Sequence, residues 1–137
     1  MGMEGFEVVK KLYAAVAAQD VAALEACLHP DVIAIEADAL PYGGRYEGRG
    51  AFVRLIQALR DHWREFEVAE LQGFEQLTAT GTAVVTIFQF RATSRQTGEK
   101  VDQRFVEYWE LREGRIIFLQ PFYFDTHEVR RILGGSG

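Results

Sequence analysis

The feature that most constrains the fold is a run of four long segments in which apolar and polar residues alternate. These segments span residues 66–77, 80–93, 101–112 and 115–124. In the second segment, one face consists of Val84, Thr86, Phe88 and Phe90. Alternation with a period of two is typical of strands that bury one face. Turn-like pairs such as Thr97-Gly98 and Glu113-Gly114 connect them, so we predict an antiparallel meander. Strands of this length must curl, which gives the sheet a concave and a convex face.

The first half of the chain predicts mainly helices. Apolar residues recur at helical spacing over residues 4–18 and 51–63. In the first of these helices, one face consists of Phe6, Val9, Tyr13 and Val16. A shorter helix over residues 21–28 follows the N-cap residue Asp20, and Pro30 is expected to end it. Residues 31–38 alternate as a strand, and the glycine-rich residues 39–50 predict a loop with a short strand near Arg45 and Tyr46. A last short helix is expected over residues 126–133.

Helices that precede a sheet, rather than alternate with its strands, indicate an α+β fold. We expect three N-terminal helices to pack on a strongly curved, mostly antiparallel sheet, with a short helix at the C-terminus. This arrangement makes a cone whose open end can hold a pocket. The length of 137 residues indicates one domain, here residues 1–133, followed by a flexible tail at residues 134–137.

Composition excludes several classes of function. The net charge of −5 and the lack of a basic run argue against nucleic acid as a partner. No apolar segment is long enough to cross a bilayer, and the first residues lack the apolar core of a signal peptide. Cys27 is the only cysteine, so no internal disulfide can form and we expect a cytoplasmic protein. The three histidines lack metal-ligand spacing, and we expect no metal and no other cofactor.

Carboxylates placed among aromatic residues are the main functional signal. Alternation puts Glu107 between Phe105 and Trp109 on one strand face, which should be buried. A buried charge must be neutralised, paired or hydrated. Glu107 is therefore either an acid or base in a pocket, or the partner of an arginine such as Arg91 or Arg104.

Two other acidic positions are candidates for a site. Glu36 and Asp38 share a face of the first predicted strand, and we expect Asp38 to be solvated in the loop that follows. Asp125 stands three residues before Glu128, which is the spacing of a capping box. Asp125 is thus either the N-cap of the last helix or an acid at the rim of the pocket.

Several segments, taken in order, resemble a known superfamily. They are Ala17-Ala18-Gln19-Asp20, Ala22-Ala23-Leu24, His29-Pro30-Asp31-Val32, and the residues 44–52, 107–117 and 123–125. Together they are similar to the NTF2-like superfamily, and within it to the SnoaL-like and ketosteroid-isomerase-like proteins. That fold hosts isomerases, cyclases, dehydratases, epoxide hydrolases and non-catalytic binding modules.

The resemblance also implies roles for individual residues. The ketosteroid isomerases use a carboxylate base, a protonated acid that donates to the oxyanion, and a tyrosine donor on the first helix. Glu36 falls at the base position and Glu107 at the acid position. Leu12 falls at the tyrosine position, and Tyr13 is one residue away, about 100° around a helix. Because this set is incomplete, a steroid is not the expected substrate. The SnoaL-type cyclases place an acid/base aspartate on the late strands, where Asp125 lies.

We therefore expect a SnoaL-like protein that binds a small, mostly apolar molecule in the cone. If catalytic, it would be a cofactor-free isomerase, cyclase or dehydratase of the polyketide cyclase or ketosteroid isomerase type. The catalytic candidates are Glu107, Glu36 and Asp125. The residues expected to contact substrate are Tyr13, Trp63, Phe88, Phe105, Trp109 and Tyr123. The alternative is a non-catalytic ligand-binding or dimerisation module.

The opposite face of the predicted sheet is apolar as well. Its residues are Val85, Ile87, Val106, Tyr108, Phe118, Phe122 and Phe124. A contiguous apolar face of this kind should not face water. The resemblance implies association through it, and we expect a homodimer.

Overall fold

The computed structural model describes residues 3–135 and has the predicted order of helices and strands. The chain begins with the helices α1 (Glu4–Ala18) and α2 (Val21–Ala26). The strands β1 (Leu28–Glu36) and β2 (Gly44–Glu47) lead to the helix α3 (Arg49–His62). Four long strands follow, namely β3 (Trp63–Leu77), β4 (Thr82–Ser94), β5 (Lys100–Arg112) and β6 (Arg115–Tyr123). The last helix is α4 (Thr126–Ile132).

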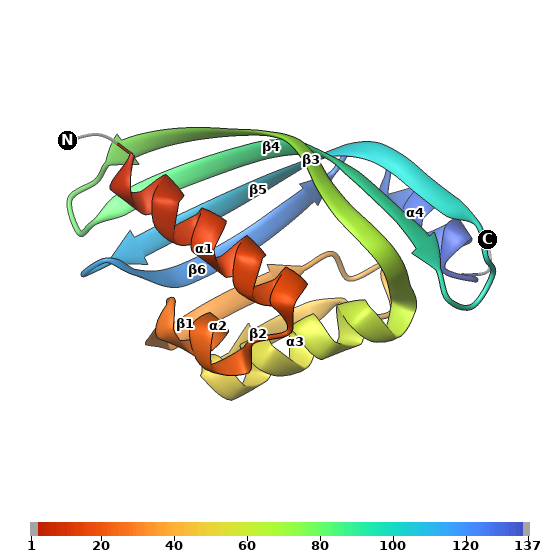
Figure 1. The fold of residues 1–137 in the computed structure, drawn as a ribbon, viewed down its shortest axis with the longest axis horizontal. Coiled ribbons are helices and arrows are strands. Elements are labelled where there is room, and N and C mark those ends of the chain that lie inside the picture. The colour runs from red at the N-terminus through yellow and green to blue at the C-terminus, as the bar shows by residue number, and fades with distance from the viewer. Residues whose placement is uncertain (1–2, 136–137) are drawn as a thin grey trace.

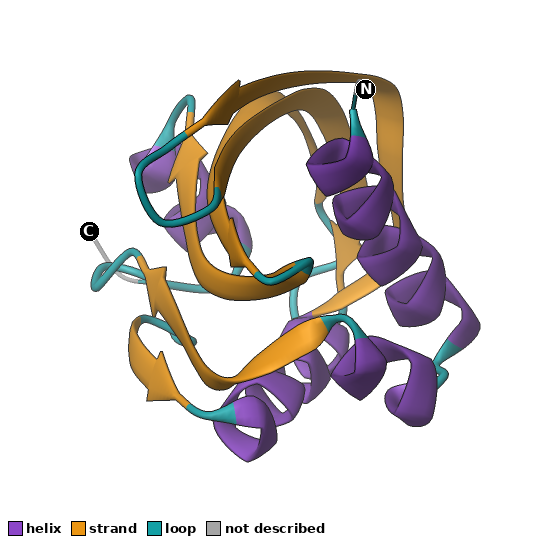
Figure 2. Ribbon diagram, turned by 90° about the vertical axis from the view of Figure 1, so that its left-hand side faces the viewer, coloured by secondary structure: helices purple, strands orange, loops and turns teal. Residues whose placement is uncertain are grey.

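All six strands form one sheet in the order β2-β1-β6-β5-β4-β3 (Figure 1). Every neighbouring pair is antiparallel except β1 and β6, which are parallel. Figure 2 shows the sheet curling into an open cone that the N-terminal helices close. Helix α1 packs on β3, β4 and β6, and α3 packs on β1, β2 and β3. The expected α+β cone is confirmed.

The predicted faces of the long strands are also confirmed. Val84, Thr86, Phe88 and Phe90 of β4 are buried on the concave face. The register of β4 and β5 places Thr86 opposite Glu107 and Phe88 opposite Phe105. The alternating pattern therefore brings the acidic and aromatic candidates of these two strands to the inside of the cone.

The main departure from the prediction lies at the start of β1. Helix α2 ends at Ala26, and the strand already begins at Leu28, so Pro30 lies in a strand rather than at a helix end. Leu28 is fully buried and aligned with Ile116 of β6, and the register shifts between Leu28 and Ile33. A proline is tolerated within a sheet where regular pairing is interrupted.

Strand β3 forms one edge of the sheet and is irregular at two places. It follows α3 without a loop, three residues earlier than the predicted start at residue 66. Its pairing with β4 shifts register between Arg64 and Glu67 and again between Ala69 and Gln72. Glu65 and Glu70, at these shifts, have left-handed backbone with φ values of 55°. These features mark two β-bulges, which bend and twist the strand.

The described C-terminal residues pack against the end of α4. The backbone amides of Gly134 and Gly135 donate to the carbonyls of Arg131 and Arg130. The rest of the predicted tail, residues 136–137, lies outside the described residues. Within residues 3–135, no helix is long and apolar enough to span a membrane.

Candidate functional site

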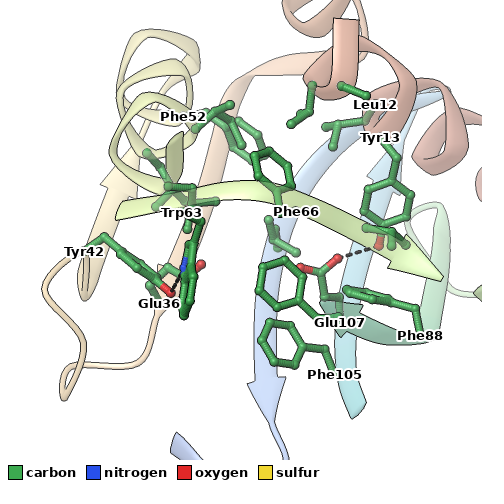
Figure 3. Close-up of a pocket in the computed structure, with 18 of the residues that line it drawn as sticks. Leu12, Tyr13, Glu36, Tyr42, Phe52, Trp63, Phe66, Phe88, Phe105 and Glu107 are labelled. Atoms are coloured by element: carbon green, nitrogen blue, oxygen red, sulfur yellow. Dashed lines mark hydrogen bonds between the residues drawn. The ribbon is translucent and has the colours of Figure 1, made fainter. Parts of the chain in front are cut away.

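A cavity of about 370 Å³ lies between the concave face of the sheet and the helices α1 and α3 (Figure 3). Its wall is mostly apolar, with residues such as Leu12, Phe52, Leu55, Phe88 and Phe90. This volume falls within the range of roughly 300–1,000 Å³ that is common for small-molecule sites. Among residues 3–135, no cluster of potential ligands is arranged to hold a metal ion.

The first polar group in the cavity is Glu107, from the middle of β5. Its Oε1 accepts a hydrogen bond of 2.5 Å from the hydroxyl of Tyr13 on α1. Figure 3 shows this tyrosine reaching down from the helix toward the carboxylate. The Tyr13 hydroxyl also lies 2.9 Å from Oγ1 of Thr86, which accepts a bond of 3.1 Å from Nε1 of Trp109. Side chains of α1, β4 and β5 thus form a series of hydrogen bonds that ends at Glu107.

The second polar group is Glu36, at the end of β1. It is only 4% exposed, and its Oε1 accepts a hydrogen bond of 2.5 Å from the hydroxyl of Tyr123 at the end of β6. Tyr42, from the loop before β2, lies beside them and accepts a bond of 3.2 Å from Nε1 of Trp63. The second carboxylate therefore also has a tyrosine donor and a tryptophan nearby.

Burial shifts the acid–base behaviour of both carboxyl groups. It raises the pKa of Glu36 to about 8, helped by the negative charge of Glu107 and opposed by the Tyr123 hydrogen bond. It raises the pKa of Glu107 to about 7, opposed by the hydrogen bond from Tyr13. Burial also raises the pKa of Tyr13 and of Tyr123, so both remain protonated donors near neutral pH. The pair of glutamates can thus hold a proton at a pH where ordinary carboxyl groups have none.

The structure brings most of the predicted site residues together. All six aromatic candidates line the cavity, namely Tyr13, Trp63, Phe88, Phe105, Trp109 and Tyr123. Glu36 and Glu107 line it as well. Leu12 and Tyr13 both border the cavity, so Tyr13 reaches Glu107 although it is offset from the isomerase position.

Asp125 lies elsewhere and does not line the cavity. Its Oδ1 accepts a 3.0 Å bond from the amide of Glu128, which makes it the N-cap of α4. The buried Gln103 holds its backbone, because the amide of Asp125 donates to Oε1 of Gln103 over 3.0 Å. Of the two alternatives for Asp125, the structure shows the helix cap.

The arginine alternative for Glu107 was wrong. Arg91 pairs instead with Glu67, Glu70 and Asp102. Glu107 is opposite Thr86 on the concave face, whereas positions 91 and 104 alternate to the convex face. Asp38 is exposed beyond the end of β1, as expected.

Two polar residues of the site were not predicted. Tyr42 lies in a loop, where no periodicity indicates which way a side chain points. Thr86 was placed on the correct strand face, but a threonine there is equally typical of an ordinary strand. Only the three-dimensional arrangement shows that its hydroxyl joins Trp109 to Tyr13.

Several solved structures with the same fold are less than 25% identical to this chain in sequence. An NTF2-like protein of unknown function from Burkholderia pseudomallei K96243 is 24% identical, with a TM-score of 0.78, and the match covers 96% of this chain and 98% of that one. TerC, co-crystallised with polyporic acid, is 18% identical with a TM-score of 0.80, over 97% of this chain and 100% of TerC. A Pseudomonas putida KT2440 protein, provisionally described as a polyketide cyclase, is 21% identical with a TM-score of 0.75, over 96% and 99% of the two chains.

These likenesses establish a shared fold and no shared activity. Among proteins with curated descriptions, none matches the sequence significantly. The family comparison is more specific, because residues 9–119 match the model of the SnoaL-like domain. These residues include most of α1, the strands from β1 to β5, and both cavity carboxylates. The chain therefore belongs to the SnoaL-like domain family.

Proposed function

We propose that this protein binds a small, mostly apolar carbonyl compound and catalyses a cofactor-free proton transfer, such as an isomerisation, cyclisation or dehydration. The observation that carries the proposal is the pair of buried carboxyl groups, both with raised pKa values, in one apolar cavity. Proton transfer at a carbon beside a carbonyl needs a base near the carbon and a donor near the oxygen. The two glutamates supply one group of each kind.

The hydrogen bonds around the two carboxyl groups support an assignment of roles. Glu107 accepts from Tyr13, whose hydroxyl also contacts Thr86, and bonds donated to a carboxylate favour its ionised form, so we assign Glu107 as the base that removes the proton from carbon. Burial raises the pKa of Glu36 to about 8, so we assign it as the acid that donates to the carbonyl oxygen as negative charge develops there. Return of the proton from Glu107 to a different carbon completes an isomerisation. This assignment is the reverse of the one that the resemblance to ketosteroid isomerases implies.

The lining of the cavity also favours an uncharged ligand. It contains two glutamates and no lysine, arginine or histidine among the described residues. A carboxylate on the ligand would lose its hydration without gaining a cationic partner, which is unfavourable. A neutral ketone with aromatic or aliphatic rings avoids this cost and can pack on the aromatic wall.

Exchange of carbon-bound hydrogen tests the proposal without knowledge of the natural substrate. The protein is incubated in D₂O with a panel of aryl ketones and cyclic 1,3-diketones, and deuterium at the α-carbon is followed by NMR. We expect exchange above the buffer rate, with a maximum between the two pKa values of about 7 and about 8. Glu107→Gln should reduce the rate by roughly 10²–10⁴-fold. Glu36→Gln keeps a hydrogen-bond donor and should lose less.

Binding is measured on the same panel, with a carboxylate-bearing analogue of each ketone as a matched control and polyporic acid as an additional probe. Ligands that bind without any exchange would contradict the catalytic proposal and favour the non-catalytic binding module. Unchanged exchange in Glu107→Gln would contradict the role of Glu107. Preferred binding of the carboxylate analogues would contradict the proposed ligand charge.

We also propose that the protein forms a homodimer through the convex face of the sheet. Phe122 is 50% exposed and Phe124 is 83% exposed on that face. Phe74, which is 54% exposed, is aligned with Val85 and extends the apolar surface toward β3. A second copy of the chain would bury these side chains.

A further inference from the structure

Thr86 is a polar residue at the centre of the buried layer. It is fully buried in β4, between Val84 and Phe88 on the concave face, and lies opposite Glu107 on β5. A valine would have the same shape without the cost of burying a hydroxyl group. The hydroxyl therefore matters for the contacts that it makes, which are with Trp109 and Tyr13.

The Trp109 indole and the Glu107 carboxyl group, at the two ends of this series of contacts, set the direction of its hydrogen bonds. An indole N–H can only donate, so Oγ1 of Thr86 accepts from Trp109 over 3.1 Å. At the other end, Oε1 of Glu107 accepts from the Tyr13 hydroxyl over 2.5 Å. The contact of 2.9 Å between Thr86 and Tyr13 then uses the one proton that remains, which is that of Thr86. The hydrogen bonds thus run from Trp109 through Thr86 and Tyr13 to Glu107.

The reverse direction does not satisfy the same groups. If Glu107 donated to Tyr13, the tyrosine would donate to Thr86, whose oxygen would then accept from both Tyr13 and Trp109. The Thr86 proton would have no acceptor among the hydrogen bonds of the described side chains. A carboxylic acid with its proton on Oε2 can also accept from Tyr13 at Oε1, but a donated hydrogen bond is stronger to a carboxylate, so the arrangement stabilises the ionised form of Glu107, which is the form a base requires.

We infer that Thr86 is a positioning residue, whose hydroxyl directs the Tyr13 proton to Glu107 and thereby keeps this carboxylate ready to act as the base. Consecutive hydrogen bonds polarise one another, so a donor on the Tyr13 oxygen makes the Tyr13 hydroxyl a stronger donor. Edge contacts of the Tyr13 ring with Phe88 and Trp109, both at 5.9 Å between centroids, hold the ring in place. This inference rests on the proposed role of Glu107, but its test requires no turnover.

The test compares Thr86→Val, which removes the hydroxyl and keeps the shape, with Thr86→Ser, which keeps the hydroxyl. Glutamate labelled with ¹³C at the side-chain carboxyl reports each pKa by NMR, and Glu107→Gln assigns the signal. We expect Thr86→Val to raise the pKa of Glu107 by roughly half a pH unit or more. Thr86→Ser should leave it close to the wild-type value, and Glu36 should change less than Glu107 in both variants.

An unchanged or lowered pKa of Glu107 in folded Thr86→Val would overturn the inference. If Thr86→Val does not fold, as judged by thermal unfolding, Trp109→Phe takes its place, because it removes the first donor and keeps Thr86. The same upward change, of smaller size, is then expected, and no change would overturn the inference. Failure of deuterium exchange in the wild type would contradict the proposed function alone, since the NMR titration does not depend on it.

Discussion

Glu36 and Glu107 each hold a proton more tightly in the folded chain than a glutamate does in water. Their pKa values rise from the ordinary value of 4.5 to about 8 and about 7. Folding therefore favours the protonated forms. The resulting stabilisation is fully present below a pH of about 4.5 and is lost as the pH rises through about 7 for Glu107 and about 8 for Glu36.

This titration predicts a specific effect of Glu36→Gln on stability. Glutamine resembles the protonated acid, so the variant should match the wild type at pH 5. At pH 9, where the wild type must bury a charge, the variant should have the larger free energy of unfolding, by about 2 kcal/mol or more. Urea unfolding at pH 5, 7 and 9 measures the difference, with Glu25→Gln on the exposed surface of α2 as the control. A constant difference across this pH range would contradict the raised pKa of Glu36.

Helix α4 is attached to the sheet through its N-cap residue, Asp125. Asp125 accepts a bond from the Glu128 amide, and Gln103 of β5 holds the Asp125 backbone. We expect Asp125→Ala to lower the free energy of unfolding by about 1 kcal/mol and Asp125→Asn to stay close to the wild type, because asparagine also caps helices. Both variants should retain deuterium exchange, since residue 125 does not line the cavity. Loss of exchange in a folded Asp125→Asn would restore the catalytic interpretation of this aspartate.

The long strands were predictable because their side chains alternate between a buried and a solvated face. That pattern alone was enough to place Phe88 and Phe90 on one face of β4, and Phe105, Glu107 and Trp109 on one face of β5. The helix pattern likewise placed Tyr13 on the apolar face of α1. The choice of the concave surface came from the resemblance to a family and not from periodicity.

Features that depend on contacts distant in sequence could not be predicted. Pro30 enters a strand because β6, from the far end of the chain, pairs with β1 around it. Tyr42 reaches the cavity from a loop and accepts a hydrogen bond from Trp63. The role of Thr86 depends on two partners on different elements. None of these arrangements leaves a local pattern in the sequence.

The proposed dimer should have twice the mass of a single chain in solution. Phe122→Glu puts a charge in the convex apolar face, where burial without a partner is costly. We expect the wild type to be a dimer and Phe122→Glu to be a monomer with an intact fold, as measured by size-exclusion chromatography with light scattering. The control is Val21→Glu, which changes an apolar residue of α2 that is 46% exposed. A monomeric wild type at high concentration would contradict the proposal.

The two bulges of β3 affect how copies of this protein can meet. An edge strand of fifteen residues is a ready template for another strand, and long, flat edges invite aggregation. The left-handed residues Glu65 and Glu70 interrupt this template twice, and each places a charged residue at the interruption. An incoming strand would find only short stretches of matching hydrogen-bond partners. Edge-to-edge growth into fibrils through β3 is therefore disfavoured.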